Sequence, residues 1–301
     1  MKKWVLILGL VLSFNAYGAN DCVDGEQNCW DCWRSDSDLC TARLNGTDLS
    51  ITGTGEMKDY GWYRDGNTGI YITDAPWGNT ENGNTEIENI TIEGITRVGN
   101  SAFLGSTNLE NITFSDSVVE IGKNALHSSG LTHLELPPNL KVLAGGSIQN
   151  IQSVNSIVIP DGVETIGNAV FWNWSSLESI VIPNSVTTLG HDDFANCPNL
   201  KSIVIGDGVT SILENSFSNT PAYIYCQDTQ ERSCKDLIGE NNQEALGKLR
   251  LYKVENGKIK VGSKTYDSLS DLPQYKLRRI YTIDEANQVA GKVNSVKIRY
   301  R

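Results

Sequence analysis

The residues in this chain best suited to chemistry are its cysteines, because thiolates bind metals and form redox pairs. Cys29 and Cys32 have the Cys-x-x-Cys spacing that is typical of zinc sites and dithiol oxidoreductases. The sequence has no second such pair or nearby histidine to complete a zinc set, and no strand–helix–strand pattern around this one. We therefore expect structural disulfides here and no bound metal.

Disulfides are the expected state of all the cysteines but one. The first four allow three pairings, and the sequence leaves that choice open. The last two are close enough in sequence to close one loop. Cys197 takes the place that Ile151 and Trp174 take in the two preceding repeats, so we expect a buried apolar plug and not a reactive thiol. The disulfide candidates are Cys22, Cys29, Cys32, Cys40, Cys226 and Cys234.

Catalysis needs polar side chains that converge, and the sequence does not specify such a set. His127, His133 and His191 fall in three different repeats, and we expect them at the surface. Asp192 and Asp193 are adjacent on a loop and should diverge, whereas the two carboxylates of a glycosidase face one sugar. Phosphate-binding, dinucleotide-binding, zinc-protease and EF-hand motifs are missing from the sequence. We predict a protein that is not an enzyme and has no cofactor.

A repeat of 22 or 23 residues organises the middle of the chain. One copy cannot bury its apolar side alone, so successive copies must stack and share a core. The predicted fold is a repeat solenoid of short, parallel, stacked strands. The copies are 87–108, 109–130, 131–153, 154–176, 177–199 and 200–222. The apolar positions of one copy are Leu177, Ile180, Ile182, Val186, Leu189 and Phe194.

Each repeat should contribute one strand to that sheet. Ile180 and Ile182 alternate with Val181, which is the period-two pattern of a strand. Pro160 and Pro183 end their strands because proline cannot donate to the ladder. At a spacing of ~4.8 Å, six strands make a sheet about 25–30 Å wide. Such a sheet offers a platform of the right size for a protein partner.

The outward positions of these strands are the best functional candidates, because the core does not dictate them. From the fourth repeat on, the middle outward residue is valine, with serine two residues before it. Valine also simply favours strands, and both interpretations remain open. An aligned valine row on an acidic surface would suit recognition of a protein. The predicted partner contacts are Val158, Val181, Val204, Ser156, Ser179, Ser202 and His133.

The pattern L-x-x-I-x-I-P-x-x-V-x-x-I-G-x-x-x-F, from Leu177 to Phe194, resembles the leucine-rich repeat of BspA-like bacterial surface proteins. Residues 48–57, followed by the segment 75–77, resemble the N-terminal cap of that family. Leu126 and Ile148 depart from the phenylalanine of the pattern but still suit a core. The resemblance covers about residues 41–234. It implies a leucine-rich repeat solenoid with a curved parallel sheet and with short strands and loops on its convex side. It also implies adhesion to host, matrix or cell-surface proteins, without naming the ligand.

The two ends of the chain differ from the repeats. Residues 1–18 have the order of a secretory signal peptide, which is charged, then apolar, then small. Residues 19–86 should hold the cysteine-containing region and a β cap, with a hairpin turn at 53–55. The solenoid, 87–234, includes a last strand after the sixth repeat. Residues 246–301 should form a small basic α+β module, with a hairpin around 256–257, a strand at 279–283, a helix at 284–290 and a strand at 293–300.

Charge separates these regions and limits the partners. Residues 19–245 hold 10 Lys and Arg against 31 Asp and Glu, whereas residues 246–301 hold 13 against 5. The acidic body disfavours nucleic acid and anionic membranes as main partners. For the basic end, three roles remain open: a cap on the solenoid, a tether to an anionic cell envelope, or a signal for surface export.

These observations together predict an exported protein that binds a protein partner through the face of its repeat sheet. Its expected place is the cell surface or the extracellular medium, with the periplasm as an alternative. No segment after the signal peptide is long and apolar enough to suggest a transmembrane helix. The alternative function is a structural component of the cell envelope without an external ligand.

Overall fold

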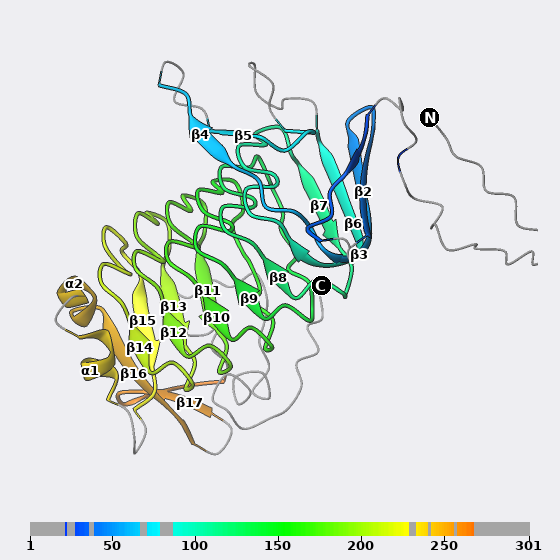
Figure 1. Cartoon of the computed structure of the whole chain (residues 1–301). Helices are drawn as coiled ribbons and strands as arrows, with labels where there is room; N and C mark the ends of the chain where they lie inside the picture. The colour runs from blue at the N-terminus through cyan, green and yellow to red at the C-terminus, as the bar shows by residue number, and fades with distance from the viewer. Residues whose placement is uncertain are drawn as a thin grey trace, which may run out of the picture.

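The computed structural model describes residues 22, 28–35, 39–66, 71–78, 87–228, 233–239, 242–255 and 258–267. Its body is a β-solenoid of about seven turns with parallel strand pairing and little helix, as predicted (Figure 1). Each turn has two strand positions, so two parallel ladders run along the solenoid. The expected signal peptide at 1–18 and the elements expected between 279 and 300 lie outside the described residues.

The first ladder is built from the predicted alternating segments. Its strands are in register from turn to turn, so that Ser179 lies beside Ser202, and Val181 beside Val204. Equivalent residues of successive repeats therefore form straight rows across the sheet. The strands of this ladder are β6 (Asn89–Val98, at its start), β7 (Asn111–Phe114), β11 (Ser179–Ile182), β13 (Ser202–Ile205) and β15 (Tyr223–Cys226).

Two of the predicted strands in this ladder are wrong. Residues 133–136 form no strand, and the segment 156–159 makes only the single bridge from Ser156 to Ser179. The repeat at 131–153 has leucines where the others have β-branched or aromatic residues, and Pro137 and Pro138 follow at once, so its tendency to form a strand is weak. The next segment then has a strand neighbour on one side only.

The second ladder consists of two-residue strands on the other side of the core. The chain enters it through β6, which turns at Gly94, where φ is +74° and a Cβ would lie 2.0 Å from the Gly53 carbonyl oxygen. A glycine follows three of these strands, at 122, 167 and 190, because a Cβ there would collide with the backbone of the preceding turn. They are β8 (Glu120–Ile121), β9 (Val142–Leu143), β10 (Thr165–Ile166), β12 (Thr188–Leu189) and β14 (Ser211–Ile212).

The core between the ladders is continuous along the solenoid. Phe171, Phe194 and Phe217 stack in successive turns, with ring centroids 5.3 and 6.1 Å apart and nearly parallel planes. Trp174 is fully buried, and its Nε1 donates to the carbonyl of Ile148 at 2.7 Å. Cys197 is equally buried, as predicted, and burial raises the pKa of its thiol to about 12.

The third side of each solenoid turn consists of tight backbone bends, in which some residues adopt the left-handed backbone conformation. Asn150, Asn173, Asn196 and Asn219 repeat there with φ of 54–60°, a conformation that asparagine tolerates better than most residues. Their side chains also bond across turns, since Asn219 Nδ2 donates to Asn196 Oδ1 at 3.0 Å.

The N-terminal cap extends the first ladder by antiparallel and then parallel pairing. Two disulfides hold it, Cys22–Cys29 and Cys32–Cys40, which settles the pairing that the sequence left open. The predicted hairpin turn at 53–55 is wrong, because these residues lie within a strand that bulges where it pairs with β6. The cap strands are β1 (Cys29–Asp31), β2 (Leu39–Asn45), β3 (Asp48–Glu56), β4 (Trp62–Arg64) and β5 (Tyr71–Thr73).

The C-terminal end closes the solenoid with two short helices and then continues its sheet. The Cys226–Cys234 disulfide forms as predicted, and it ties α1 to β15. The predicted hairpin is present, because β16 and β17 pair antiparallel, and β16 also pairs in parallel with β15. The elements are α1 (Cys234–Ile238), α2 (Gln243–Leu246), β16 (Leu249–Glu255), β17 (Lys258–Val261) and β18 (Lys264–Tyr266).

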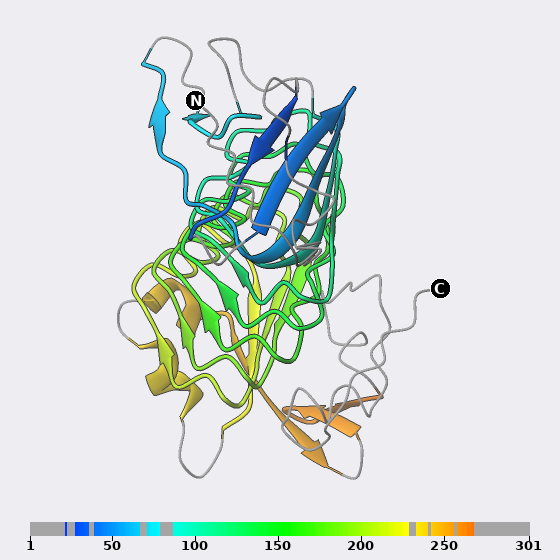
Figure 2. The same cartoon turned by 45° about the vertical axis from the view of Figure 1, so that its right-hand side comes forward.

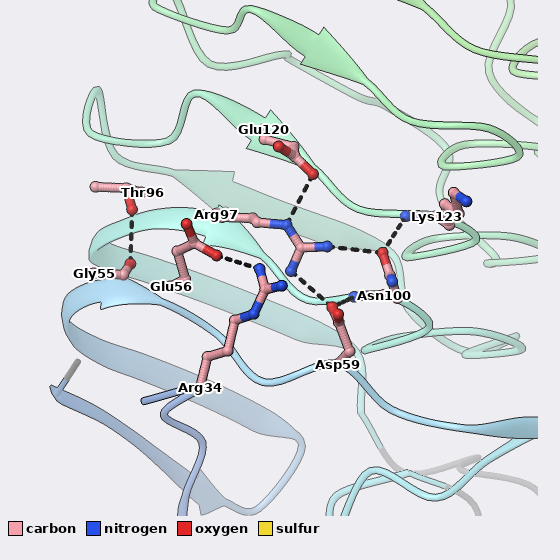
Figure 3. A network of polar contacts seen from close by, with 9 residues as sticks. All are labelled: Arg34, Gly55, Glu56, Asp59, Thr96, Arg97, Asn100, Glu120 and Lys123. Carbon is pink, nitrogen blue, oxygen red and sulfur yellow. Dashed lines mark hydrogen bonds and ion pairs between the residues drawn. The ribbon is translucent and has the colours of Figure 1, made fainter. Parts of the chain in front are cut away.

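A polar network joins the cap to the first two repeats (Figure 3). The guanidinium of Arg97 donates to Asp59 at 2.7 Å, to Glu120 at 2.8 Å and to Asn100 at 2.9 Å. Asn100 Oδ1 also accepts from the backbone N–H of Lys123. Burial by itself would raise the pKa of Asp59, but the Asn100 N–H and Arg97 outweigh it and lower that pKa. Arg97, 8 % exposed, thus links three successive layers.

We expect Arg97→Met to lower the free energy of unfolding by about 2 kcal/mol, because two partly buried carboxylates lose their partner. Urea denaturation followed by circular dichroism measures this. Arg34→Ala is the matched control, since its ion pair with Glu56 is about half exposed and should contribute less than about 1 kcal/mol. Equal losses in the two variants would contradict a bridging role for Arg97.

Candidate protein-binding face

The candidate site is the outward side of the first ladder, which we call the long-strand face. Two rows of side chains cross it, and each row takes one residue from every turn. The first row runs Asp48, Asn89, Asn111, His133, Ser156, Ser179 and Ser202. The second row runs Ser50, Thr91, Thr113, Glu135, Val158, Val181 and Val204.

The N-terminal part of this face is polar and ordered by its own side chains. Asn111 Nδ2 donates to Asn89 Oδ1 at 2.9 Å, and Asn89 Nδ2 donates to Asp48 Oδ1 at 2.8 Å. Thr91 and Thr113 lie exposed beside this ladder of amides. The asparagine side chains already hold each other in place. They would therefore lose less conformational freedom when a ligand binds to them.

The middle of the face changes from polar to apolar. His133 Nε2 lies 3.3 Å from Glu135 Oε1, and both side chains are more than half exposed. One turn further on, Ser156 and Val158 are half-buried, and Val181 in the next turn is half-buried too. Four of the seven predicted contact residues, His133, Ser156, Val158 and Val181, therefore reach the surface.

The C-terminal part of the face is covered by the chain itself, through a strap formed by β16, β17 and β18 (Figure 2). Val204 is completely buried, so the expectation that it is exposed is wrong. It packs with Tyr225, Tyr252 and Ile259 in a second apolar cluster on the outer side of the sheet. Val181 borders this cluster.

Ser179 and Ser202 are also buried, at 1 % and 0 % exposure, and their expected exposure is wrong as well. Within the described part of the chain, the Ser202 hydroxyl has no hydrogen-bond partner. Nearby, the guanidinium of Arg250 lies 4.4 Å from the ring centre of Tyr223. Both serines lie beside the valines against which the strap packs, at the same end of the face.

The sequence of the strap contains a pattern that indicates this packing against the sheet. Along 251–253 and 258–260, exposed Leu251, Lys253, Lys258 and Lys260 alternate with buried Tyr252 and Ile259. That alternation requires an apolar surface under one side of the hairpin. The valine row is such a surface, and it adjoins the last turn.

The three histidines lie in different turns and do not converge on one another. His127 is buried, at 7 % exposure, which corrects the expectation of three surface histidines. The Tyr71 ring of the cap covers it at a centroid distance of 4.5 Å, and burial lowers the pKa of His127 to about 4. His191 is half-buried in another turn.

Asp193 is also buried, unlike its neighbour Asp192. Its carboxylate accepts the backbone N–H groups of Val170 at 3.1 Å and Gly190 at 2.5 Å. Burial raises the pKa of this carboxyl well above its usual range. The contacts are structural, because the buried group bonds to the backbone of its own turn and of the preceding turn.

The described residues show no metal-binding constellation. No group of three or more His, Cys, Asp or Glu side chains within them is placed to hold a metal ion. Cys29 and Cys32 belong to two different disulfides and form no pair with each other.

Comparison with known proteins identifies the repeat. A family described as BspA type leucine rich repeat region (6 copies) matches residues 81–191 and 164–278, which is well over half of the chain. The chain belongs to the BspA-type leucine-rich repeat family. BspA-type proteins are generally repeat proteins without enzymatic activity. No curated protein matches this BspA-type chain.

Solved structures of bacterial leucine-rich repeat proteins are similar to this BspA-type chain. A protein from Bacteroides ovatus is 20% identical with a TM-score of 0.42, over 58% of this chain and 59% of its own. A T. pallidum leucine-rich repeat protein is 19% identical with a TM-score of 0.39, over 68% and 92%. A leucine-rich cell surface protein of Faecalibacterium prausnitzii is 14% identical with a TM-score of 0.35, over 88% and 98%. The chain thus spans 59% of the Bacteroides ovatus protein's length.

The burial of His127 predicts a loss of stability in acid. The folded protein keeps this imidazole neutral down to pH about 4, whereas the unfolded chain binds the proton near its ordinary pKa of 6.5. The contribution of the neutral His127 to the free energy of unfolding is therefore complete above pH 6.5. It is lost as the pH falls towards 4, by up to about 3 kcal/mol. Chemical denaturation at several pH values between 7 and 4 measures the slope.

His127→Leu should flatten this slope, since Leu104 fills the corresponding position of the preceding repeat and is buried there. The control is His133→Leu, at an exposed position, which should leave the slope as in the unmodified protein. Parallel pH profiles for His127→Leu and the unmodified protein would refute the role of the buried histidine.

Proposed function

We propose that this protein is exported and binds a protein partner through the uncovered part of the long-strand face, from Asp48 to Val181. The observation that carries the proposal is the pair of registered rows on this face. They present amide, hydroxyl, imidazole and carboxylate groups and then half-exposed valines, on strands fixed by a continuous core. The contact residues retained in the proposal are His133, Ser156, Val158 and Val181.

Export is supported by the three disulfides, which persist in oxidising compartments and are rare in the cytoplasm. No helix in the described part of the chain is long and apolar enough to cross a membrane. We propose the cell surface or the extracellular medium as its place, with the periplasm as the alternative compartment.

The chemistry of the face suits a protein more than a small ligand. Polar side chains surround a short apolar strip, which is the arrangement of a small interface with an apolar centre and a polar rim. Val158 and Val181 supply the apolar centre, and His133 with Glu135 begins the rim. The partner would lie across the strands and meet one new pair of side chains about every 4.8 Å.

Of the three roles considered for the basic C-terminal region, the strap favours that of a cap on the C-terminal end of the solenoid, because β16 continues the solenoid sheet. A structural role in the envelope is the second candidate function. Lys253 and Lys260 lie opposite each other and exposed on the outer side of the strap. Exposed lysines attract anionic surfaces, so this side of the strap suits contact with an anionic envelope.

The test replaces the apolar centre of the face by charge. Val158→Glu should weaken binding at least about tenfold, since it places a charge at the centre of the interface. Ser156→Arg, in the same turn, tests the row beside it. Binding is measured by surface plasmon resonance against immobilised fibronectin, fibrinogen, laminin and collagen, with circular dichroism to confirm the fold.

Thr165→Glu is the matched control, because Thr165 is exposed in the second ladder of the same repeat. It should leave binding unchanged. The proposal fails if Val158→Glu and Thr165→Glu bind alike. Retention in the envelope fraction without binding to any of the four proteins would favour the structural role instead.

A further inference from the structure

A small ribbon formed by β4 and β5 lies at the N-terminal end of the molecule (Figure 1), and two of its aromatic side chains are exposed to solvent. All three residues of β4 are exposed. Trp62 is 49% exposed and Tyr63 59% exposed, on opposite sides of the ribbon. Most large apolar side chains of the described residues are buried, so this display is not required by the core.

The Trp62 ring is held by a stack that reaches into the solenoid. Tyr71 lies 4.5 Å from the His127 ring and 5.8 Å from the Trp62 ring, measured between centroids. The Arg64 guanidinium lies 5.6 Å from the centre of the same Tyr71 ring. These separations are those of favourable aromatic and cation–π contacts. Trp62 is therefore fixed on one side and open on the other.

The size of the ribbon argues against a protein partner at this place. Three-residue strands are only about 10 Å long. A stable protein interface needs about 800 Å² from each partner, which is more than such a ribbon offers. A ligand the size of one to three sugar rings fits it better.

The polar groups around Trp62 also fit a sugar. Arg64 and Asp65 follow it, and Asp74 lies exposed beside the ribbon, where its Oδ1 accepts the Gly61 N–H at 2.6 Å. Carboxylate and guanidinium groups pair with hydroxyls, while an indole covers the C–H face of a pyranose. Asp65, which follows β4, and the exposed Asp74 give the ribbon two carboxylates, and these disfavour its insertion into a lipid surface.

We propose that the exposed face of Trp62 is a stacking platform for a pyranose ring, and that the β4–β5 ribbon is a carbohydrate-binding site. It is separate from the long-strand face and does not depend on the function proposed for that face. Arg64, two residues further along β4 and so on the same side of the ribbon as Trp62, is the side chain we expect to meet the sugar hydroxyls. Tyr71 is a positioning residue, since it holds Trp62 against the solenoid.

Native affinity electrophoresis of the full chain tests this, with a soluble β-glucan, a xylan and solubilised peptidoglycan fragments in the gel. At least one of them should retard the protein. Trp62→Ala should weaken that retardation about tenfold or more, and Trp62→Phe should restore part of it. Trp33→Ala is the matched control, because Trp33 is 43% exposed in the same cap but outside the stack.

Three results would overturn the proposal: no retardation by any of the polysaccharides, equal retardation of Trp62→Ala and the unmodified chain, or equal losses for Trp33→Ala and Trp62→Ala. Binding to phosphatidylcholine vesicles that is lost in Trp62→Ala, without binding to polysaccharide, would assign the ribbon to lipid instead. Trp62→Ala should keep any protein binding that Val158→Glu abolishes, which distinguishes the two sites.

Discussion

No single turn of the solenoid can bury its own apolar side. Each turn covers the one before it and needs the next to cover it. The fully buried rows, such as Leu177, Leu200 and the stacked phenylalanines, follow from this. The two ends must then be closed by other means. Disulfide-linked strands do so at the start, and α1 with its disulfide and β16 do so at the end.

The same constraint separates fold from function. Inward positions are set by the core and would be similar for any ligand, so the function must be sought in the outward ones. The strap shows that outward positions can also serve the fold. Its hairpin has one apolar side, through Tyr252 and Ile259, and buries that side on the valine row. Val204 is thereby buried within the molecule, and the surface that remains accessible to a partner lies closer to the N-terminal repeats.

The sequence predicted the repeat, its register, the inward residues and the Cys226–Cys234 pair, because periodic burial leaves a clear pattern. It did not predict the burial of Val204, which depends on a contact with residues about fifty positions further on. It also missed the burial of His127, because nothing in its own repeat shows that Tyr71 of the cap lies over it. Local patterns thus describe each turn well, and contacts made by the ends are what they miss.

The strap divides the long-strand face into a covered and an open part. Cysteine labelling tests it directly, with Val158→Cys and Val204→Cys prepared separately and treated with a maleimide reagent under native conditions. We expect rapid labelling at 158 and protection at 204 until the protein is denatured. The native Cys197 is buried and should contribute no background in the folded state. Equally rapid labelling at both positions would show that the strap does not cover position 204.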